Sequence, residues 1–143
     1  MILVDANLLL YATITDYEQH AAARAWLEDR LNAPARVGLP WPSLLAFLRI
    51  ATNPRLFPRP LSIHHAWSRV EEWLAVPAVW IPTETDQHVE ILGRLLTHVA
   101  ASGNLVSDAH VAALAIEHGL TLCSTDHDFS RFPSLRFENP IAR

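Results

Sequence analysis

Short apolar runs alternate with longer helix-forming segments along this 143-residue chain, and the alternation is the strongest constraint on its fold. Runs of three or four aliphatic residues are too short for helices and fit strands that are covered on both faces. Strands that alternate with helices of about ten to sixteen residues predict βαβ units and a mostly parallel sheet. The sequence therefore predicts one domain over residues 1–143, a single three-layer α/β/α sandwich.

The expected elements can be placed by their apolar pattern and by the residues that bound them. The predicted strands are "MILV" (1–4), "ARVGLP" (35–40), "AVWIP" (78–82), "LTLC" (120–123) and an edge strand "LRF" (135–137). The predicted helices run from Asp16 to about Leu31, from Pro42 to Asn53, over residues 64–74, from Asp86 to about Val99, and over residues 107–119. Gly119 is the expected carboxyl-terminal stop of the last helix.

Composition narrows the class of protein. Half of the residues are hydrophobic and 18% are charged, which is typical of a folded globular chain. A single cysteine, Cys123, cannot form an internal disulfide or a cysteine-based zinc cage. The amino terminus lacks the basic start of a signal peptide, and no apolar stretch reaches the ~18 residues of a membrane span. We therefore expect a cytoplasmic protein without a membrane partner.

The charged residues exclude several kinds of phosphate chemistry. All eleven basic residues are arginine, so neither a Schiff-base lysine nor a P-loop lysine exists. The net charge of −4 argues against a protein that binds nucleic acid through bulk positive charge. This net charge is compatible with an enzyme that binds a phosphodiester through metal ions and a local arginine patch.

Four aspartates are expected at one edge of the predicted sheet. Asp5 ends the first strand, Asp126 and Asp128 follow the strand 120–123, and Asp108 lies in the first turn of the helix 107–119. In a parallel sheet, ligands bind outside the carboxyl ends of the strands. Carboxylates gathered there repel one another unless a cation lies among them, and oxygen ligands suit Mg²⁺ or Mn²⁺. The pattern predicts metal-assisted hydrolysis of a phosphodiester.

Each of these aspartates also has a structural interpretation. Asp108 is favoured near a helix amino terminus by the helix dipole, and Asp128 can cap the turn at Phe129. Asp5 is harder to explain in this way, because a carboxylate directly after buried aliphatic residues needs a partner.

Three blocks of the sequence resemble the PIN-domain ribonucleases, and above all the VapC-type toxins of bacterial toxin–antitoxin pairs. They are "ILVDANLLLYA", "NLVSDAHVAALAIEHG" and "TLCSTDHDFSRFPSLRFENP", in the order and spacing of the family. The resemblance implies a Mg²⁺- or Mn²⁺-dependent endoribonuclease that is inhibited by an antitoxin protein and forms a homodimer. It implies metal-binding roles for Asp5, Asp108 and Asp126, and a catalytic role for these three and Asp128.

One position departs from the family pattern. The family carries a glutamate in a helical context like "A-E-L-R", whereas the matching stretch here reads Ala46, Phe47, Leu48, Arg49. With one carboxylate fewer, we expect one tightly held ion and not two.

Two alternatives remain open on the sequence. A small phosphatase could use the D-x-D pair of Asp126 and Asp128, although only fifteen residues follow Asp128. A PIN-like module that binds RNA or protein without catalysis is favoured by Phe47 and by the negative net charge, and is opposed by the set of Asp5, Asp108 and Asp126.

Overall fold

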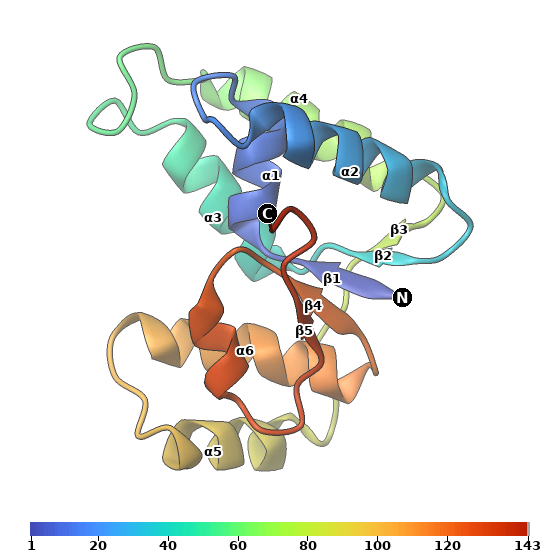
Figure 1. Cartoon of the computed structure of the whole chain (residues 1–143), viewed down its shortest axis with the longest axis vertical. Coiled ribbons are helices and arrows are strands. Elements are labelled where there is room, and N and C mark those ends of the chain that lie inside the picture. Colours follow the sequence, from blue (N-terminus) through green and yellow to red (C-terminus); the bar gives the residue numbers. More distant parts are fainter. Residues whose placement is uncertain (143) are drawn as a thin grey trace.

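The computed structural model describes residues 1–142, which form a five-stranded parallel sheet between two layers of helices (Figure 1). The strands are β1 (Ile2–Val4), β2 (Val37–Gly38), β3 (Val79–Trp80), β4 (Thr121–Cys123) and β5 (Phe137–Glu138), in the order β3-β2-β1-β4-β5. Every adjacent pair is parallel. The predicted α/β/α sandwich is therefore confirmed, including the short last strand at the sheet edge.

Within residues 1–142, six helices cover the sheet, four on one face and two on the other (Figure 1). The first layer holds α1 (Ala6–Thr13), α2 (His20–Asn32), α3 (Trp41–Ala51) and α4 (Ile63–Leu74). The second holds α5 (His88–His98) and α6 (Asn104–Glu117), and a short 3₁₀ helix η1 (His127–Arg131) follows β4. None of the helices in residues 1–142 has the length and apolar character needed to cross a bilayer.

Two hydrophobic cores explain why the strands read as continuous apolar runs. Successive side chains of a strand point to opposite faces of the sheet. Val4 and Cys123 accordingly pack with α1–α4, whereas Leu3 and Leu122 pack with α5 and α6. Both faces of the central strands are buried, so a polar residue is first tolerated where each strand ends.

The order of the strands reverses between β1 and β4, which lie side by side at the centre of the sheet. The register pairs Val4 with Cys123, and the Asp5 backbone N–H donates to the Cys123 carbonyl over 3.0 Å. The chain segments that leave these two strands therefore emerge next to each other. Parallel sheets bind their ligands at such a reversal point.

Some helices begin later or earlier than the sequence predicted. α2 begins at His20 and not at Asp16, and α5 begins at His88 and not at Asp86. α6 begins at Asn104, three residues before the expected start, because Gly103 turns the chain at a φ of 56° and Leu105 already packs on the core. Asp108 consequently lies in the second turn of α6, and the expected first-turn position was wrong.

Candidate active site

Three of the four predicted aspartates line one open cavity of about 740 Å³ at the carboxyl edge of the sheet. Asp5 follows β1, Asp126 follows β4, and Asp108 projects from α6. These residues are far apart in sequence, and the reversal point of the sheet brings them together. Asp128 does not line the cavity and is exposed on η1.

Hydrogen bonds fix the orientation of the Asp5 carboxylate. Asp5 caps α1, and its Oδ1 accepts from the Ala6 backbone N–H over 2.9 Å. Its Oδ2 accepts from the hydroxyl of the fully buried Ser124 over 2.7 Å. The same hydroxyl accepts from the Asn7 amide over 3.1 Å and from the Asp126 backbone N–H over 3.0 Å. Ser124 thus ties the ends of β1 and β4 together.

Asp126 and Asp128 have different roles in the loop that follows β4. Asp126 caps η1, because its Oδ1 accepts from the Asp128 backbone N–H over 2.9 Å. The capping that the sequence suggested for Asp128 therefore belongs to Asp126. Asp128 contributes a charge near the cavity, and that charge is the weakest of the three carboxylate charges that raise the pKa of Asp108.

The cavity disfavours the ionised forms of Asp108 and Asp5. Burial, followed by the charges of Asp126, Asp5 and Asp128, raises the pKa of Asp108 to about 6. Burial also raises the pKa of Asp5, although the hydrogen bonds from Ser124 and Ala6 oppose this effect. Within residues 1–142, none of these aspartates forms an ion pair with an arginine or histidine. A cation in the cavity would relieve this repulsion.

The donor set fits a cation that keeps much of its water. In the described part of the chain, no three His, Cys, Asp or Glu side chains form a ready-made metal cage. The Asn7 Oδ1 atom beside the cluster is buried without a hydrogen-bond partner. Mg²⁺ is commonly held by one or two carboxylates together with water and substrate phosphate. The arrangement suits that mode of binding better than a closed protein cage.

Phe47 does not face the cavity, although the resemblance aligned it with a metal-binding glutamate. Its ring is fully buried and packs edge-on against Trp73, with the centroids 4.9 Å apart. Ser43, Ala46 and Arg49 line the cavity from α3 instead. Neighbouring side chains on a helix point about 100° apart. Ala46 therefore faces the cavity, whereas Phe47 faces the hydrophobic core.

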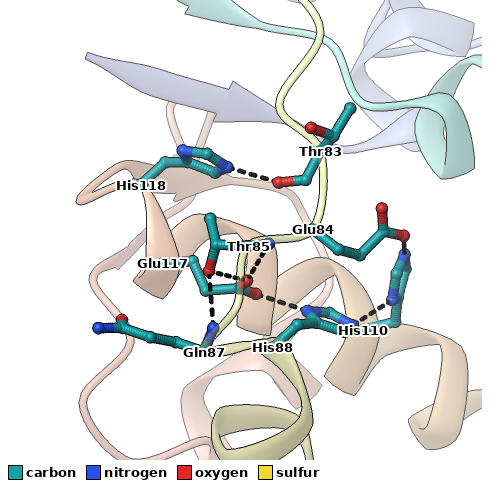
Figure 2. A network of polar contacts seen from close by, with 8 residues as sticks. All are labelled: Thr83, Glu84, Thr85, Gln87, His88, His110, Glu117 and His118. Atoms are coloured by element: carbon teal, nitrogen blue, oxygen red, sulfur yellow. Dashed lines mark hydrogen bonds and ion pairs between the residues drawn. The ribbon is translucent and has the colours of Figure 1, made fainter.

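A network of polar side chains joins α5, α6 and the loop that precedes α5 (Figure 2). Glu84, His110, His88 and Glu117 are joined in that order, and the first of the two histidines lines the cavity. The pKa of Glu117 is lowered: burial alone would raise it, but hydrogen bonds from His88 and Thr85 outweigh that effect.

Sequence analysis missed this network and assigned Glu84 no part in the site. His110 lies on a helix and Glu84 lies in the loop 83–87, so no periodic pattern in the sequence links the two residues. Only the spacing of His110 from Asp108 on one helix offered a signal.

Comparison with known proteins places the chain in a family. Residues 2–135 match the PIN domain. The chain belongs to the PIN-domain family. It is 47% identical over 142 residues to Ribonuclease VapC37 of Mycobacterium tuberculosis, covering 99% of both chains. It is also 41% identical over 141 residues to Ribonuclease VapC33 of the same species, again covering 99% of both chains.

Solved structures of other proteins share the fold. The FitAcB structure from Neisseria gonorrhoeae matches with a TM-score of 0.69 at 18% identity, covering 98% of both chains. The structure of VapBC2 from Rickettsia felis bound to a promoter DNA fragment matches with a TM-score of 0.68 at 19% identity, covering 97% of this chain and 98% of that one. The predicted family and fold are confirmed.

Proposed function

We propose that this PIN-domain protein is a metal-dependent endoribonuclease that acts as the toxin of a toxin–antitoxin pair. The observation that carries the proposal is the meeting of Asp5, Asp108 and Asp126 in one cavity, where burial and neighbouring carboxylates raise the pKa values of Asp5 and Asp108. The full-length similarity to two curated VapC ribonucleases supports RNA as the substrate.

In this proposal, Asp5, Asp108 and Asp126 hold one Mg²⁺ or Mn²⁺ ion directly or through water. Such an ion polarises a phosphodiester and lowers the pKa of an attacking water. Ser124 orients Asp5, and the Asp128 backbone N–H orients Asp126. Arg49, an exposed residue that lines the cavity from α3, binds a substrate phosphate. The Asp128 carboxylate contributes charge at the entrance without binding the ion.

The proposed partners are a cognate antitoxin and a second copy of the chain. Large hydrophobic side chains are exposed on and near α3 and α4: Trp41, Leu45, Leu56, Ile63 and Trp67. Exposed apolar side chains in one region are typical of protein interfaces. The solved relatives include VapBC complexes, which supports an antitoxin as one of the two partners.

A binding module without catalysis is the second candidate. The cavity face of α3 carries no acidic residue among Ser43, Ala46 and Arg49, which favours a weak metal site. The two candidates differ in whether the cavity binds Mn²⁺ with useful affinity.

The test compares purified protein, free of antitoxin, in Mn²⁺ and in chelator. We expect cleavage of a structured RNA with Mn²⁺, no cleavage with chelator, and a loss of at least about 100-fold in the Asp5→Asn variant. Asn also caps helices, so the melting temperature of this variant in chelator should not fall. Cleavage that persists in chelator would contradict the proposal, and RNA binding without cleavage or Mn²⁺ binding would establish the second candidate.

A further inference from the structure

One stretch of the chain carries positive charge without any opposing acid. Residues 31–70 hold five arginines and no aspartate or glutamate, so all fifteen acidic residues lie in the rest of the chain. The stretch includes β2, α3 and most of α4. A protein with a net charge of −4 therefore presents one segment of uniformly positive charge, and such a segment attracts anionic partners.

Three of the five arginines in this stretch have free side chains. Two are engaged, because Arg36 stacks on an aromatic ring and Arg69 pairs with a glutamate. Within residues 1–142, Arg49, Arg55 and Arg59 form no ion pair and stack on no aromatic ring. All three are exposed, so their guanidinium groups are open to an anion. Guanidinium groups bind phosphate through parallel N–H···O hydrogen bonds.

Arg49 connects the positive stretch to the cavity. Ser43, Ala46 and Arg49 follow one another at a spacing of three on α3 and share the face of the helix that lines the cavity. In the described part of the chain, Arg49 is the only arginine that lines it. α3 ends two residues later at Ala51, and the chain continues into a loop that projects beyond the helices (Figure 1). This loop carries the other two free arginines.

The loop between α3 and α4 is fixed at its base and at its centre. The Leu61 backbone N–H donates to the Ala51 carbonyl over 2.9 Å, which closes the base of the loop. The Phe57 ring is buried and packs edge-on against Tyr17, with the centroids 5.8 Å apart. Three prolines within residues 52–60 restrict the backbone further. The two arginines flank the anchored ring and are therefore held in place relative to α3.

The loop arginines lie within reach of an RNA that is bound in the cavity. Arg55 is six residues along the chain from Arg49, and a fully extended chain of that length spans at most about 22 Å. One nucleic-acid strand places a phosphate every 3.4 Å or so along its axis, so this span corresponds to about six nucleotides. An RNA that crosses the cavity continues beyond it, and its phosphates are repelled by the aspartates and attracted by the side that α3 forms.

We propose that Arg55 and Arg59 bind backbone phosphates of the RNA a few nucleotides from the cleaved bond, on the side where α3 borders the cavity. Arg49 binds the nearest phosphate, and the two loop arginines extend the contact outward. Contacts of this kind position a nucleic acid and carry no sequence preference of their own. The proposal rests on the proposed ribonuclease function, because it names how the substrate of the same cavity is held outside it.

The first experiment measures RNA binding and its dependence on salt. Arg55→Gln with Arg59→Gln removes both charges, and the melting temperature should hold because both side chains are exposed. We expect the double variant to bind a labelled RNA hairpin about tenfold more weakly. The slope of log affinity against log salt concentration should become shallower by about 1.5, because two fewer counter-ions are released. Fluorescence anisotropy in chelator measures both quantities without cleavage, and an unchanged slope would overturn the proposal.

Arg94 provides a matched control for net charge. It is exposed on α5, in the opposite layer of helices, and forms no ion pair within residues 1–142. Arg94→Gln and Arg55→Gln change the net charge equally, but only Arg55→Gln should weaken binding and make the salt slope shallower by about 0.8. Equal changes in the two variants would show that the RNA responds to net charge alone, and the proposal would fail.

Lysine at the same positions tests whether charge is what the loop supplies. Arg55→Lys with Arg59→Lys keeps two cations that can each neutralise a phosphate, so this variant should recover the salt slope of the unaltered protein. A slope as shallow as that of the glutamine variant would contradict phosphate binding at the loop.

Cleavage kinetics distinguish a remote contact from one at the reacting atoms. With Mn²⁺, the double glutamine variant should raise KM for RNA about tenfold with little change in kcat, because the loop arginines bind substrate and transition state equally. A lower kcat with an unchanged KM would contradict the proposed place of the contact.

A protein contact at this loop would give a different result. Leu56 lies beside Arg55 and is 57% exposed, so the loop also presents an apolar side chain. If the arginines serve a contact with another protein or a second copy of the chain, the double glutamine variant should alter sedimentation or partner binding while its RNA affinity stays intact. That outcome would overturn the proposal.

The readouts separate this inference from the proposed function. If the unaltered protein fails to cleave RNA with Mn²⁺, the ribonuclease proposal fails. If it cleaves RNA while the double glutamine variant keeps the same RNA affinity, salt slope and KM, only the inference about the loop arginines fails.

Discussion

Two groups of carboxylates, the aspartates that line the cavity and Glu117 at the end of α6, have pKa values that shift in opposite directions. Asp5 and Asp108 face other carboxylates, and their pKa values are raised. The pKa of Glu117 is lowered, because the hydrogen bonds from His88 and Thr85 outweigh the effect of burial. Glu117 has the imidazole of His88 beside it, whereas within residues 1–142 the aspartates form no ion pair with an arginine or histidine. This difference distinguishes a cluster that stabilises the fold from a cluster that is built to receive a cation.

The largest expected effect is a loss of stability on α3, where Phe47 faces the core and its neighbour Ala46 faces the cavity. Phe47→Glu places an unpaired carboxylate in the core beside Trp73 and should cost about 4 kcal/mol or more in the free energy of unfolding. Ala46→Glu instead adds a carboxylate to the cavity lining and should tighten Mn²⁺ binding with little loss of stability. Urea unfolding and Mn²⁺ titration measure the two effects. A stable Phe47→Glu variant with tighter Mn²⁺ binding would show that α3 is rotated relative to this structure.

The next largest effect tests the contacts of Glu117 with His88 and Thr85. Glu117→Ala leaves the His88 ring and the Thr85 N–H without their acceptor at a partly exposed site and should lower the free energy of unfolding by about 2 kcal/mol. Chemical denaturation in chelator measures the change. A variant as stable as the unaltered protein would remove the contrast between the two groups.

Asp108→Asn should have a smaller effect of opposite sign, because it should raise the free energy of unfolding at pH 7. The folded protein holds a proton on Asp108 up to a pH of about 6, whereas the unfolded chain releases it near pH 4. The free energy of unfolding of the metal-free protein should therefore fall as the pH rises from about 4 to about 6. Asp108→Asn removes this fall and should be more stable at pH 7 by about 1 kcal/mol, allowing for screening by water.

Thermal melts in chelator across this pH range check the prediction. Protons compete with the ion for Asp108, so Mn²⁺ binding by the unaltered protein should also weaken below about pH 6. A variant that melts lower at every pH would identify Asp108 as a structural residue.

The smallest effect separates the two aspartates that follow β4. Asp128 is exposed and outside the cavity lining, so Asp128→Asn should change RNA cleavage by no more than about threefold. Asp126→Asn should reduce cleavage by about 100-fold or more, because Asp126 lines the cavity. Cleavage assays with Mn²⁺ compare the two. A large loss in Asp128→Asn would restore the catalytic role that the sequence resemblance gave to this residue.

Much of the fold was determined by the sequence alone. Aliphatic runs such as "MILV" and "LTLC" must be buried on both faces, and their alternation with helices leaves few topologies besides a parallel sheet. The positions of Asp5 and Asp126 at the ends of these runs were sufficient to predict an acidic edge. Both predictions depend on local patterns, which the sequence displays directly.

Other features depended on contacts between distant segments. The rotation of α3 about its axis decided that Phe47 packs against Trp73 and that Ala46 faces the cavity. Likewise, Glu117 and His88 meet only because α5 packs against α6. The sequence determined which carboxylates end the strands, whereas the tertiary structure decided which polar side chains lie near each carboxylate, because charge interactions depend on distances that only packing sets.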